Sequence, residues 1–193
     1  MKTPFLFILT VLGIVACGGP EEVPGRSHGV KVPLVIDGVR YSPAEVDALF
    51  PDAQLSFFID KEAQDQGFVY AFTSEADQKT FRDRWALEHP REVQAAALSD
   101  SVFYEHINNS GASFTLAEHT LEPDLRSVCR WFTCTDWNDK ISSVTPSRTN
   151  RFTTLYEHIN YYGRSYSMAN NVFQVNLTDV NFNDLASSIT YVY

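Results

Sequence analysis

Two six-residue segments of this chain concentrate side chains that could bind a hard metal ion. Each reads Asn-Asp-x-x-Ser-Ser, and they occupy residues 138–143 and 183–188. A carboxylate, a hydroxyl and exposed backbone carbonyls supply the oxygen ligands that Ca²⁺ prefers, of which it takes six to eight. Neither segment contains a Cys or a His that would favour a softer metal. The two segments therefore place oxygen ligands twice, which points to a metal ion.

A matching hairpin signature precedes each segment. The first reads Phe103-Tyr-Glu-His-Ile-Asn108 with Gly111, and the second reads Leu155-Tyr-Glu-His-Ile-Asn160 with Gly163. Such an internal repeat determines the architecture. We expect each copy to form a strand, a tight return at a glycine with positive φ, a second strand, and further strands around the Asn-Asp-x-x-Ser-Ser segment. Four strands per copy without helices predict a Greek-key unit, and two copies predict a β-sandwich.

Together the two signatures resemble those of the βγ-crystallin family, of the microbial calcium-binding type, over residues 101–193. The resemblance implies two Greek-key motifs in one wedge-shaped domain that holds two calcium ions, each with ligands from both repeats. It implies carboxylate ligands at Asp139 and Asp184, hydroxyl ligands at Ser142 and Ser187, and backbone carbonyl ligands at Lys140, Leu185, Glu105 and Glu157. It also implies that Asn138 and Asn183 brace the loops, and we expect Ser143 and Ser188 to support the fold.

The first copy has an insertion that the second lacks. Between Leu116 and Asn138 lie 21 residues, against 14 between Met168 and Asn183. The extra length holds Cys129 and Cys134, which are five residues apart and expected to form a disulfide in an exported protein. A metal site is the alternative, although no His is near. Lys140 also places a positive side chain beside one predicted site, whereas His106 and His158 are expected to pack or lie at the surface rather than bind zinc.

The N-terminus predicts export and lipidation. After Lys2, the apolar run from Phe5 to Ala16 is too short to span a bilayer but suits the core of a signal peptide. The run ends in Ile-Val-Ala-Cys17, which resembles the lipobox of bacterial lipoproteins and implies cleavage after residue 16, lipidation of Cys17 (palmitate) and a place at the outer membrane or cell surface. Ordinary secretion is the alternative. Residues 17–30 are rich in Gly and Pro and predict a flexible tether.

Residues 31–98 predict a small α+β domain. We expect a strand over 32–39, a helix capped by Ser42, strands near Phe57 and over 68–72, and a helix capped by Ser74. The acidic residues Asp60, Glu62 and Asp65 crowd the connection between two strands, and we interpret them as a solvated turn rather than a cation site. Residues 89–100 predict a short helix or linker before the domain at 99–193.

Composition limits the classes of function that fit this chain. The net charge is −9, and Lys and Arg form no cluster, which argues against nucleic-acid binding because phosphates need basic contacts. The sequence predicts a mainly β, surface-anchored lipoprotein that binds two calcium ions for stability or for an adhesion or structural role. The alternative is a crystallin-fold inhibitor of metalloproteinases, with a protease as partner and the Cys129–Cys134 insertion as its inhibitory loop. An enzyme is disfavoured because no nucleophile–base pair and no cofactor motif is found.

Overall fold

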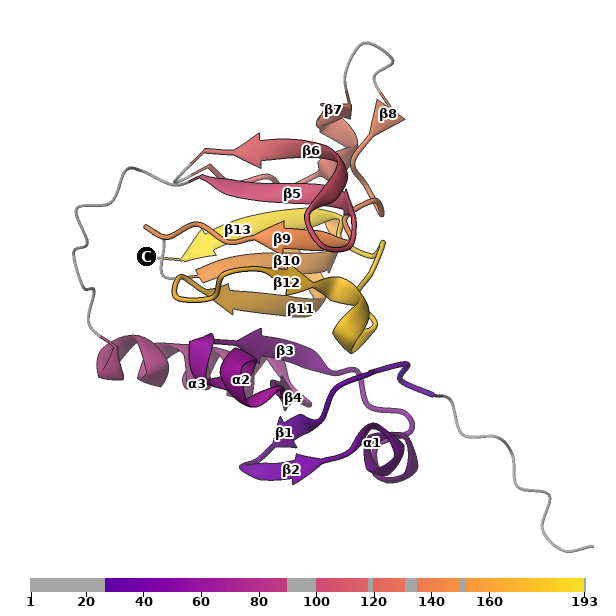
Figure 1. Ribbon diagram of the computed structural model, residues 1–193, viewed down its shortest axis with the longest axis vertical. Coiled ribbons are helices and arrows are strands. Elements are labelled where there is room, and N and C mark those ends of the chain that lie inside the picture. Colours follow the sequence, from indigo (N-terminus) through magenta and orange to yellow (C-terminus); the bar gives the residue numbers. More distant parts are fainter. Residues whose placement is uncertain (1–26, 90–99, 118–119, 131–134, 150–151, 193) are drawn as a thin grey trace, which may run out of the picture.

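The computed structural model describes residues 27–89, 100–117, 120–130, 135–149 and 152–192 (Figure 1). The predicted signal peptide, the lipidation residue Cys17, most of the tether and the linker over 90–99 lie outside these ranges, as do residues 131–134 of the insertion. Within the described ranges, no helix is both long and apolar enough to cross a membrane.

The N-terminal unit is an α+β arrangement, as predicted. Its elements in chain order are β1 (Leu34–Ile36), β2 (Val39–Tyr41), α1 (Pro43–Leu49), β3 (Ser56–Ile59), α2 (Lys61–Gln66), β4 (Val69–Phe72) and α3 (Glu75–Glu88). The Ser42 side chain caps α1 in a capping box with Glu45, and the Ser74 side chain caps α3 by accepting from the Asp77 backbone N–H. Both predicted helix starts are therefore confirmed.

The acidic connection between β3 and β4 differs from its prediction as a solvated turn. It folds into the short helix α2, and the Asp60 side chain caps it by accepting from the Ala63 N–H at 2.8 Å. Asp60 is only 5% exposed, and its other oxygen accepts from the Trp85 indole N–H at 2.8 Å. The carboxylate is buried because it has two partners, and the helix ends at Gly67 in the left-handed region (φ 66°).

The C-terminal part is almost entirely β. Its strands are β5 (Ser101–His106), β6 (Ser110–Leu116), β7 (Cys129–Arg130), β8 (Thr135–Asp136), β9 (Ser143–Thr145), β10 (Phe152–His158), β11 (Tyr162–Ala169), β12 (Val175–Asn176) and β13 (Ser188–Val192). Short 3₁₀ turns lie at Leu125–Ser127 (η1), Ile159–Tyr161 (η3) and Leu177–Val180 (η4).

The two repeats form two packed sheets by exchanging their third strands. One sheet has the order β12-β9-β5-β6, so that β12 of the second repeat pairs with the first repeat. In return, Glu122 of the first repeat forms a bridge with Ile189 of β13, through hydrogen bonds of 3.0 and 2.8 Å. The predicted double Greek-key β-sandwich is confirmed, although the third strand of the first repeat is reduced to this bridge.

One sheet joins the two units. Its order is β13-β10-β11-β3-β4-β1-β2, with β3 of the N-terminal unit running parallel to β11 of the second repeat (Figure 1). Helix α3 reinforces this junction, because buried Gln78 donates to the Phe57 carbonyl at 2.8 Å and accepts from the Ser165 hydroxyl at 2.7 Å. The apolar core is also continuous across both units. This continuity was not predicted from the sequence.

Candidate metal centre

The two hairpins share a contact that explains their common signature. Gly111 and Gly163 have φ values of 81° and 84°, in the left-handed region. A Cβ on Gly111 would lie 2.7 Å from Cδ2 of His106, and one on Gly163 would lie 2.9 Å from Cδ2 of His158. Each histidine ring therefore lies against the glycine of its own hairpin. This agrees with the packing or surface role expected for the two histidines.

The second serine of each Asn-Asp-x-x-Ser-Ser segment joins that segment to its hairpin. The Ser143 hydroxyl donates to the His106 carbonyl at 2.6 Å, and the Ser188 hydroxyl donates to the His158 carbonyl at 2.6 Å. The same hydroxyls accept backbone N–H groups of Asn109 and Tyr161, both at 3.0 Å. These buried serines satisfy the hairpin backbone, as expected of residues that support the fold.

The two loops also cross-brace each other through backbone groups. The Asp139 N–H donates to the Ala186 carbonyl at 3.1 Å, and the Asp184 N–H donates to the Ile141 carbonyl at 3.0 Å. Both aspartates have left-handed φ values, 54° and 53°, which Asp tolerates better than most residues. Ala186 and Ile141 hold equivalent places in the repeats, and no side-chain motif marks a carbonyl for this role, so sequence reasoning missed them.

The first oxygen cluster combines both repeats. The buried Ser142 hydroxyl lies 2.6 Å from the Glu105 carbonyl oxygen and 3.3 Å from Oδ1 of Asp184. Glu105 and Ser142 belong to the first repeat, and Asp184 belongs to the second. The hydroxyl has one proton for two acceptors, so one of these contacts brings lone pairs together. A cation would be stabilised by all three oxygens at once.

The second cluster repeats the serine–aspartate contact of the first. The buried Ser187 hydroxyl lies 3.4 Å from Oδ1 of Asp139, again joining the two repeats. The equivalent of Glu105 is Glu157, whose carboxylate accepts two hydrogen bonds from Arg164, at 3.0 and 3.1 Å. Burial alone would raise the pKa of Glu157, but the hydrogen bonds and charge of Arg164 outweigh it and hold that pKa below its usual value. Ala112 occupies the position of Arg164 in the first repeat.

Each loop asparagine holds the carboxylate that follows it. The Asn138 amide donates to Oδ2 of Asp139 and the Asn183 amide donates to Oδ2 of Asp184, both at 2.7 Å. Each aspartate is thus held from one side by its asparagine, while Oδ1 faces a serine of the other repeat. Oδ1 of each asparagine is buried and has no hydrogen-bond partner among the described residues. The bracing role expected from the resemblance agrees with these contacts.

The donor set fits calcium better than a softer ion. Each cluster joins one carboxylate and one hydroxyl, and the first also has the Glu105 carbonyl; these are the hard oxygen ligands of Ca²⁺. Among the described residues, no three His, Cys, Asp or Glu side chains come together in a group that could hold a metal ion, so a cation here would depend on hydroxyl and backbone oxygens beside a single carboxylate. Of the two predicted carbonyl donors within the loops, Lys140 is exposed and Leu185 packs partly against the core. The residue that directly follows the aspartate therefore has different surroundings in the two loops.

The insertion of the first repeat projects as a ribbon. Strands β7 and β8 pair antiparallel, with Cys129 opposite Asp136, and extend away from the two sheets (Figure 1). Cys129 is disulfide-bonded. Its predicted partner Cys134 lies outside the described residues, with Trp131 and Phe132, so the Cys129–Cys134 pairing stays a prediction.

Comparisons with known proteins agree with this geometry. Residues 103–168, about a third of the chain, match the model of peptidase inhibitor family I36. The chain gives no match among curated proteins.

Several solved structures are similar to the C-terminal half. A betagamma-crystallin from an archaeon is 24% identical, with a TM-score of 0.38, and the match covers 50% of this chain and 100% of that one. A betagamma-crystallin domain from Clostridium beijerinckii is 23% identical, with a TM-score of 0.38 and coverages of 49% and 98%. A beta gamma crystallin from Ciona intestinalis is 18% identical, with a TM-score of 0.39 and coverages of 48% and 99%.

The strand order decides the architecture independently of these scores. Two Greek-key motifs exchange strands to form one domain, and each carries the hairpin and the Asn-Asp-x-x-Ser-Ser loop that the resemblance requires. Residues 101–193 therefore have a βγ-crystallin-like fold, as the sequence predicted.

Proposed function

We propose that the C-terminal unit binds two calcium ions, one in each oxygen cluster shared between the repeats. The observation that carries this proposal is the position of the Ser142 hydroxyl between the Glu105 carbonyl and the Asp184 carboxylate. Ser187 and Asp139 repeat the hydroxyl–carboxylate contact on the other side. Two symmetric clusters that each join both repeats are hard to explain by packing alone.

Calcium supplies positive charge where oxygen lone pairs converge. Asp184 and Ser142, with the Glu105 carbonyl, would hold one ion, and Asp139 and Ser187 would hold the other. The Lys140, Leu185 and Glu157 carbonyls would complete the two sets. Because each ion takes ligands from both repeats, unfolding either repeat would destroy both sites. With one carboxylate per cluster we expect weak affinity, in the range of about 10⁻⁵ to 10⁻³ M that sensors and extracellular modules cover.

We propose further that the chain is an exported lipoprotein, anchored in a membrane through lipidated Cys17 and displayed at the outer membrane or cell surface. Extracellular calcium would then load weak sites and stabilise a structural or adhesion module. Labelling cells with radioactive palmitate checks the anchor. The label should enter the wild-type chain and be absent from Cys17→Ser, whereas equal labelling of both would contradict lipidation at this residue.

Thermal unfolding tests the calcium sites. A ligand that binds only the folded form adds about 1.4 kcal/mol per site at a tenfold excess over its dissociation constant. The wild-type chain should therefore melt at a higher temperature in millimolar calcium than in EDTA, and Asp139→Ala combined with Asp184→Ala should abolish the gain.

A matched control removes two exposed carboxylates outside the clusters. Asp65 and Asp83 pair with Lys61 and Lys79 on helix surfaces, so Asp65→Ala with Asp83→Ala changes the net charge equally. This control should keep the full calcium response. Identical wild-type melting curves in EDTA and in calcium would refute the proposal, as would a response that survives loss of Asp139 and Asp184.

Peptidase inhibition is the second candidate function. It is favoured by the match of residues 103–168 to peptidase inhibitor family I36, a match that also points to a non-catalytic protein. The β7–β8 ribbon lies within this range, and its projection from the sheets suits a loop presented to a protease. The matched segment, residues 103–168, includes only the first of the two Asn-Asp-x-x-Ser-Ser loops. Peptidase inhibition and calcium binding can therefore be tested separately.

A panel of metalloproteinases distinguishes the two candidates. An inhibitor should lower the activity of at least one protease at stoichiometric concentration, and Trp131→Ala with Phe132→Ala should abolish the effect while the calcium-dependent melting shift remains. The matched control is Asp139→Ala with Asp184→Ala, which should lose the calcium-dependent melting shift before it loses inhibition. No inhibition of any protease in the panel, in calcium or in EDTA, would leave the calcium-binding module as the function.

A further inference from the structure

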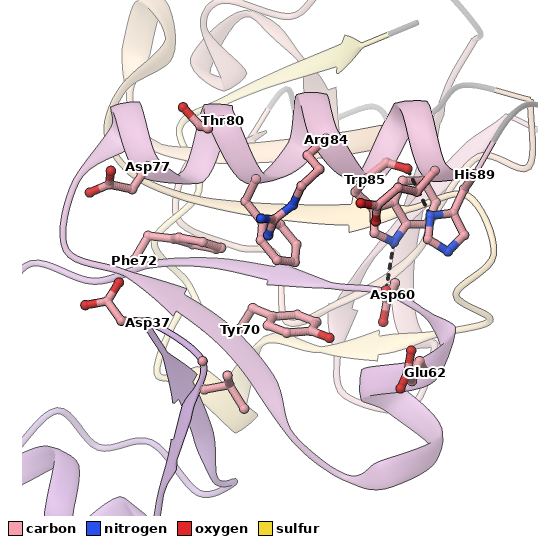
Figure 2. A pocket seen from close by; sticks show the side chains of 14 residues that line it. Asp37, Asp60, Glu62, Tyr70, Phe72, Asp77, Thr80, Arg84, Trp85 and His89 are labelled. Atoms are coloured by element: carbon pink, nitrogen blue, oxygen red, sulfur yellow. Dashed lines mark hydrogen bonds between the residues drawn. The ribbon is translucent and has the colours of Figure 1, made fainter.

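A cavity of about 640 Å³ lies in the N-terminal unit, toward the opposite end of the molecule's long axis from the β7–β8 ribbon (Figure 1). It runs between helix α3 and strand β4, and we name it the α3 groove (Figure 2). Its volume falls within the range of about 300 to 1,000 Å³ that is typical of ligand pockets. The calcium clusters and the projecting ribbon contribute no residue to it.

The floor of the α3 groove is aromatic. Tyr70 and Phe72 come from β4, and Phe81 and Trp85 come from α3. The ring centroids of Tyr70 and Phe81 are 4.8 Å apart, and those of Phe72 and Phe81 are 5.2 Å apart. Tyr70, Phe72 and Phe81 are only half-buried, so parts of their rings remain open to the groove. Aromatic faces attract cations through the ring quadrupole.

Carboxylates surround this floor. Those lining the α3 groove are Asp37, Asp60, Glu62, Asp77 and Glu88. Figure 2 shows Asp60 and Glu62 near one end and Asp37 and Asp77 near the other, with Tyr70 and Phe72 between them. Burial, followed by the charges of Asp60 and Glu62, raises the pKa of the Tyr70 hydroxyl. The carboxylates of Asp60 and Glu62 therefore contribute a negative electrostatic potential at Tyr70.

The groove already accommodates one cation of the chain itself. The Arg84 guanidinium carbon lies 5.4 Å from the centroid of the Phe81 ring. Arg84 is exposed and forms no ion pair among the described residues, so the aromatic floor, rather than a carboxylate, sets its position. Its guanidinium shows that a flat cation fits over this floor, and its single positive charge is set against the five carboxylates of the lining.

From this geometry we infer that the α3 groove binds a basic side chain, lysine or arginine, of an extended partner polypeptide. The aromatic floor takes the cationic head, and the carboxylates at the two ends take neighbouring basic groups. The spread of the carboxylates favours this ligand over a metal ion, because no three acidic, His or Cys side chains converge in the described part of the chain. The inference is independent of calcium binding.

Titration of the full chain with a tetralysine peptide tests the inference, in millimolar calcium throughout. The readout is the NMR signal of the Trp85 indole N–H, which lies in the groove and donates to Asp60. We expect a saturable shift of this signal and no shift with the fully Nε-acetylated peptide. Because this protein is acidic overall, any cationic peptide has some attraction for it, so variants must separate the groove from net charge.

Two sets of charge-matched variants make that separation. Asp37→Asn and Glu62→Gln each remove a groove carboxylate and should weaken binding about three- to tenfold, whereas Asp83→Asn, on helix α3 but outside the groove, should not. Arg84→Ala removes the resident cation and should strengthen binding, whereas Lys79→Ala, which removes an equal charge outside the groove, should not. Asp83 and Lys79 pair with each other at 2.6 Å, away from the lining.

The outcomes decide the inference in either direction. Absence of a saturable Trp85 shift overturns it, as does equal binding of the acetylated peptide. Equal effects of Asp83→Asn and the groove variants would show attraction by net charge alone and would also overturn it. Opposite effects of Glu62→Gln and Arg84→Ala, with both controls unchanged, would establish the α3 groove as the binding site.

Discussion

The two repeats share the same hairpin and loop chemistry but differ in what surrounds them. In the second repeat, β11 pairs with β3 and so becomes an interior strand of a seven-stranded sheet. In the first repeat, the equivalent strand β6 ends its four-stranded sheet, and the β7–β8 ribbon projects nearby (Figure 1). The second repeat is thus joined to the N-terminal unit, while the first ends in an edge strand beside the ribbon.

The symmetry of the two Asn-Asp-x-x-Ser-Ser loops is therefore local and does not extend to the sheets around them. The serine–aspartate and asparagine–aspartate contacts recur in both loops within about a tenth of an ångström, although the sheets around them have different sizes. Reciprocal hydrogen bonds between the loops impose this likeness, because each loop is held by the backbone of the other. Substitutions that act on one repeat alone can therefore test how far the two behave differently.

The largest expected effect is at the junction between the N-terminal unit and the second repeat. Phe58 is fully buried on β3, with ring centroids 5.6 Å from Phe152 and 5.8 Å from Trp85. Phe58→Ala should lower the free energy of unfolding by about 3–5 kcal/mol, because it opens a cavity in a core shared by both units. Denaturation followed by circular dichroism and by tryptophan fluorescence should still give one coincident transition.

Leu87→Ala is the control for this substitution, because Leu87 is 81% exposed and its loss should leave stability nearly unchanged. Two separate transitions in the wild-type chain would contradict the coupling. They would show that the N-terminal unit and the second repeat unfold independently despite their common sheet.

The next effect compares the two hairpin glycines. Gly111→Ala and Gly163→Ala should each cost about 1–2 kcal/mol, because a side chain is disfavoured at left-handed φ. The contact with the histidine ring adds to this cost. Chemical denaturation measures both values. Adding His106→Ala to Gly111→Ala should recover only the part that is due to the ring, and full recovery would show that φ strain is unimportant there.

A smaller effect is expected from the ion pair between Arg164 and Glu157 in the second repeat. In the first repeat, Ala112 takes the place of the arginine. The pKa of Glu157 is below its ordinary value of 4.5 in the folded chain, so its contribution to stability is fully present above that value. It is lost as the pH falls through the folded pKa. Arg164→Ala should therefore lower stability at neutral pH by about 1 kcal/mol or less, and by much less at acidic pH.

Unfolding measured across this pH range checks the prediction. The matched control is Ala112→Ser in the first repeat, at the position equivalent to Arg164, which should leave the pH dependence unchanged. A loss of stability that is the same at neutral and acidic pH would show that Arg164 acts through packing against Phe182, 5.8 Å from its guanidinium carbon, rather than through Glu157.

The smallest effect concerns the two proposed calcium sites. Lys140 occupies the position of Leu185, and its exposed positive side chain follows Asp139 directly. Lys140→Gln should strengthen calcium binding at the cluster of Asp139 and Ser187 by less than about fivefold, since exposed charges interact weakly. Calorimetry in an Asp184→Ala background isolates that cluster. An unchanged or weaker affinity would show that the two sites do not differ through this lysine.

Much of the C-terminal unit was predictable because its information is local. The hairpin signature sets the strand–turn–strand unit, since Gly111 and Gly163 allow a backbone that other residues avoid. The repeated Asn-Asp-x-x-Ser-Ser motif identifies four candidate ligands, Asp139, Ser142, Asp184 and Ser187. Their side chains come together in pairs. In the N-terminal unit, the capping serines at 42 and 74 likewise mark their helices, because caps depend on residues three positions apart.

The connection after β3 was predicted less well. Three acidic residues close together read as a solvated turn, yet Asp60 is buried and caps a helix. The decisive partner is the Trp85 indole, which is 25 residues away along the chain. Neighbouring residues could not reveal it, so the α3 groove, which Trp85 and Asp60 help to line, was not visible in the sequence.

By itself, the sequence determined the duplication, the Greek-key motifs and the residue types of two hard-oxygen sites. Those features depend on spacing within a few residues, where backbone geometry leaves few choices. Tertiary structure alone decided which aspartate faces which serine, because that pairing crosses more than forty residues and the interface of the repeats. It also decided that β3 extends the sheet of the second repeat, since any apolar strand of suitable length can pair with an open edge.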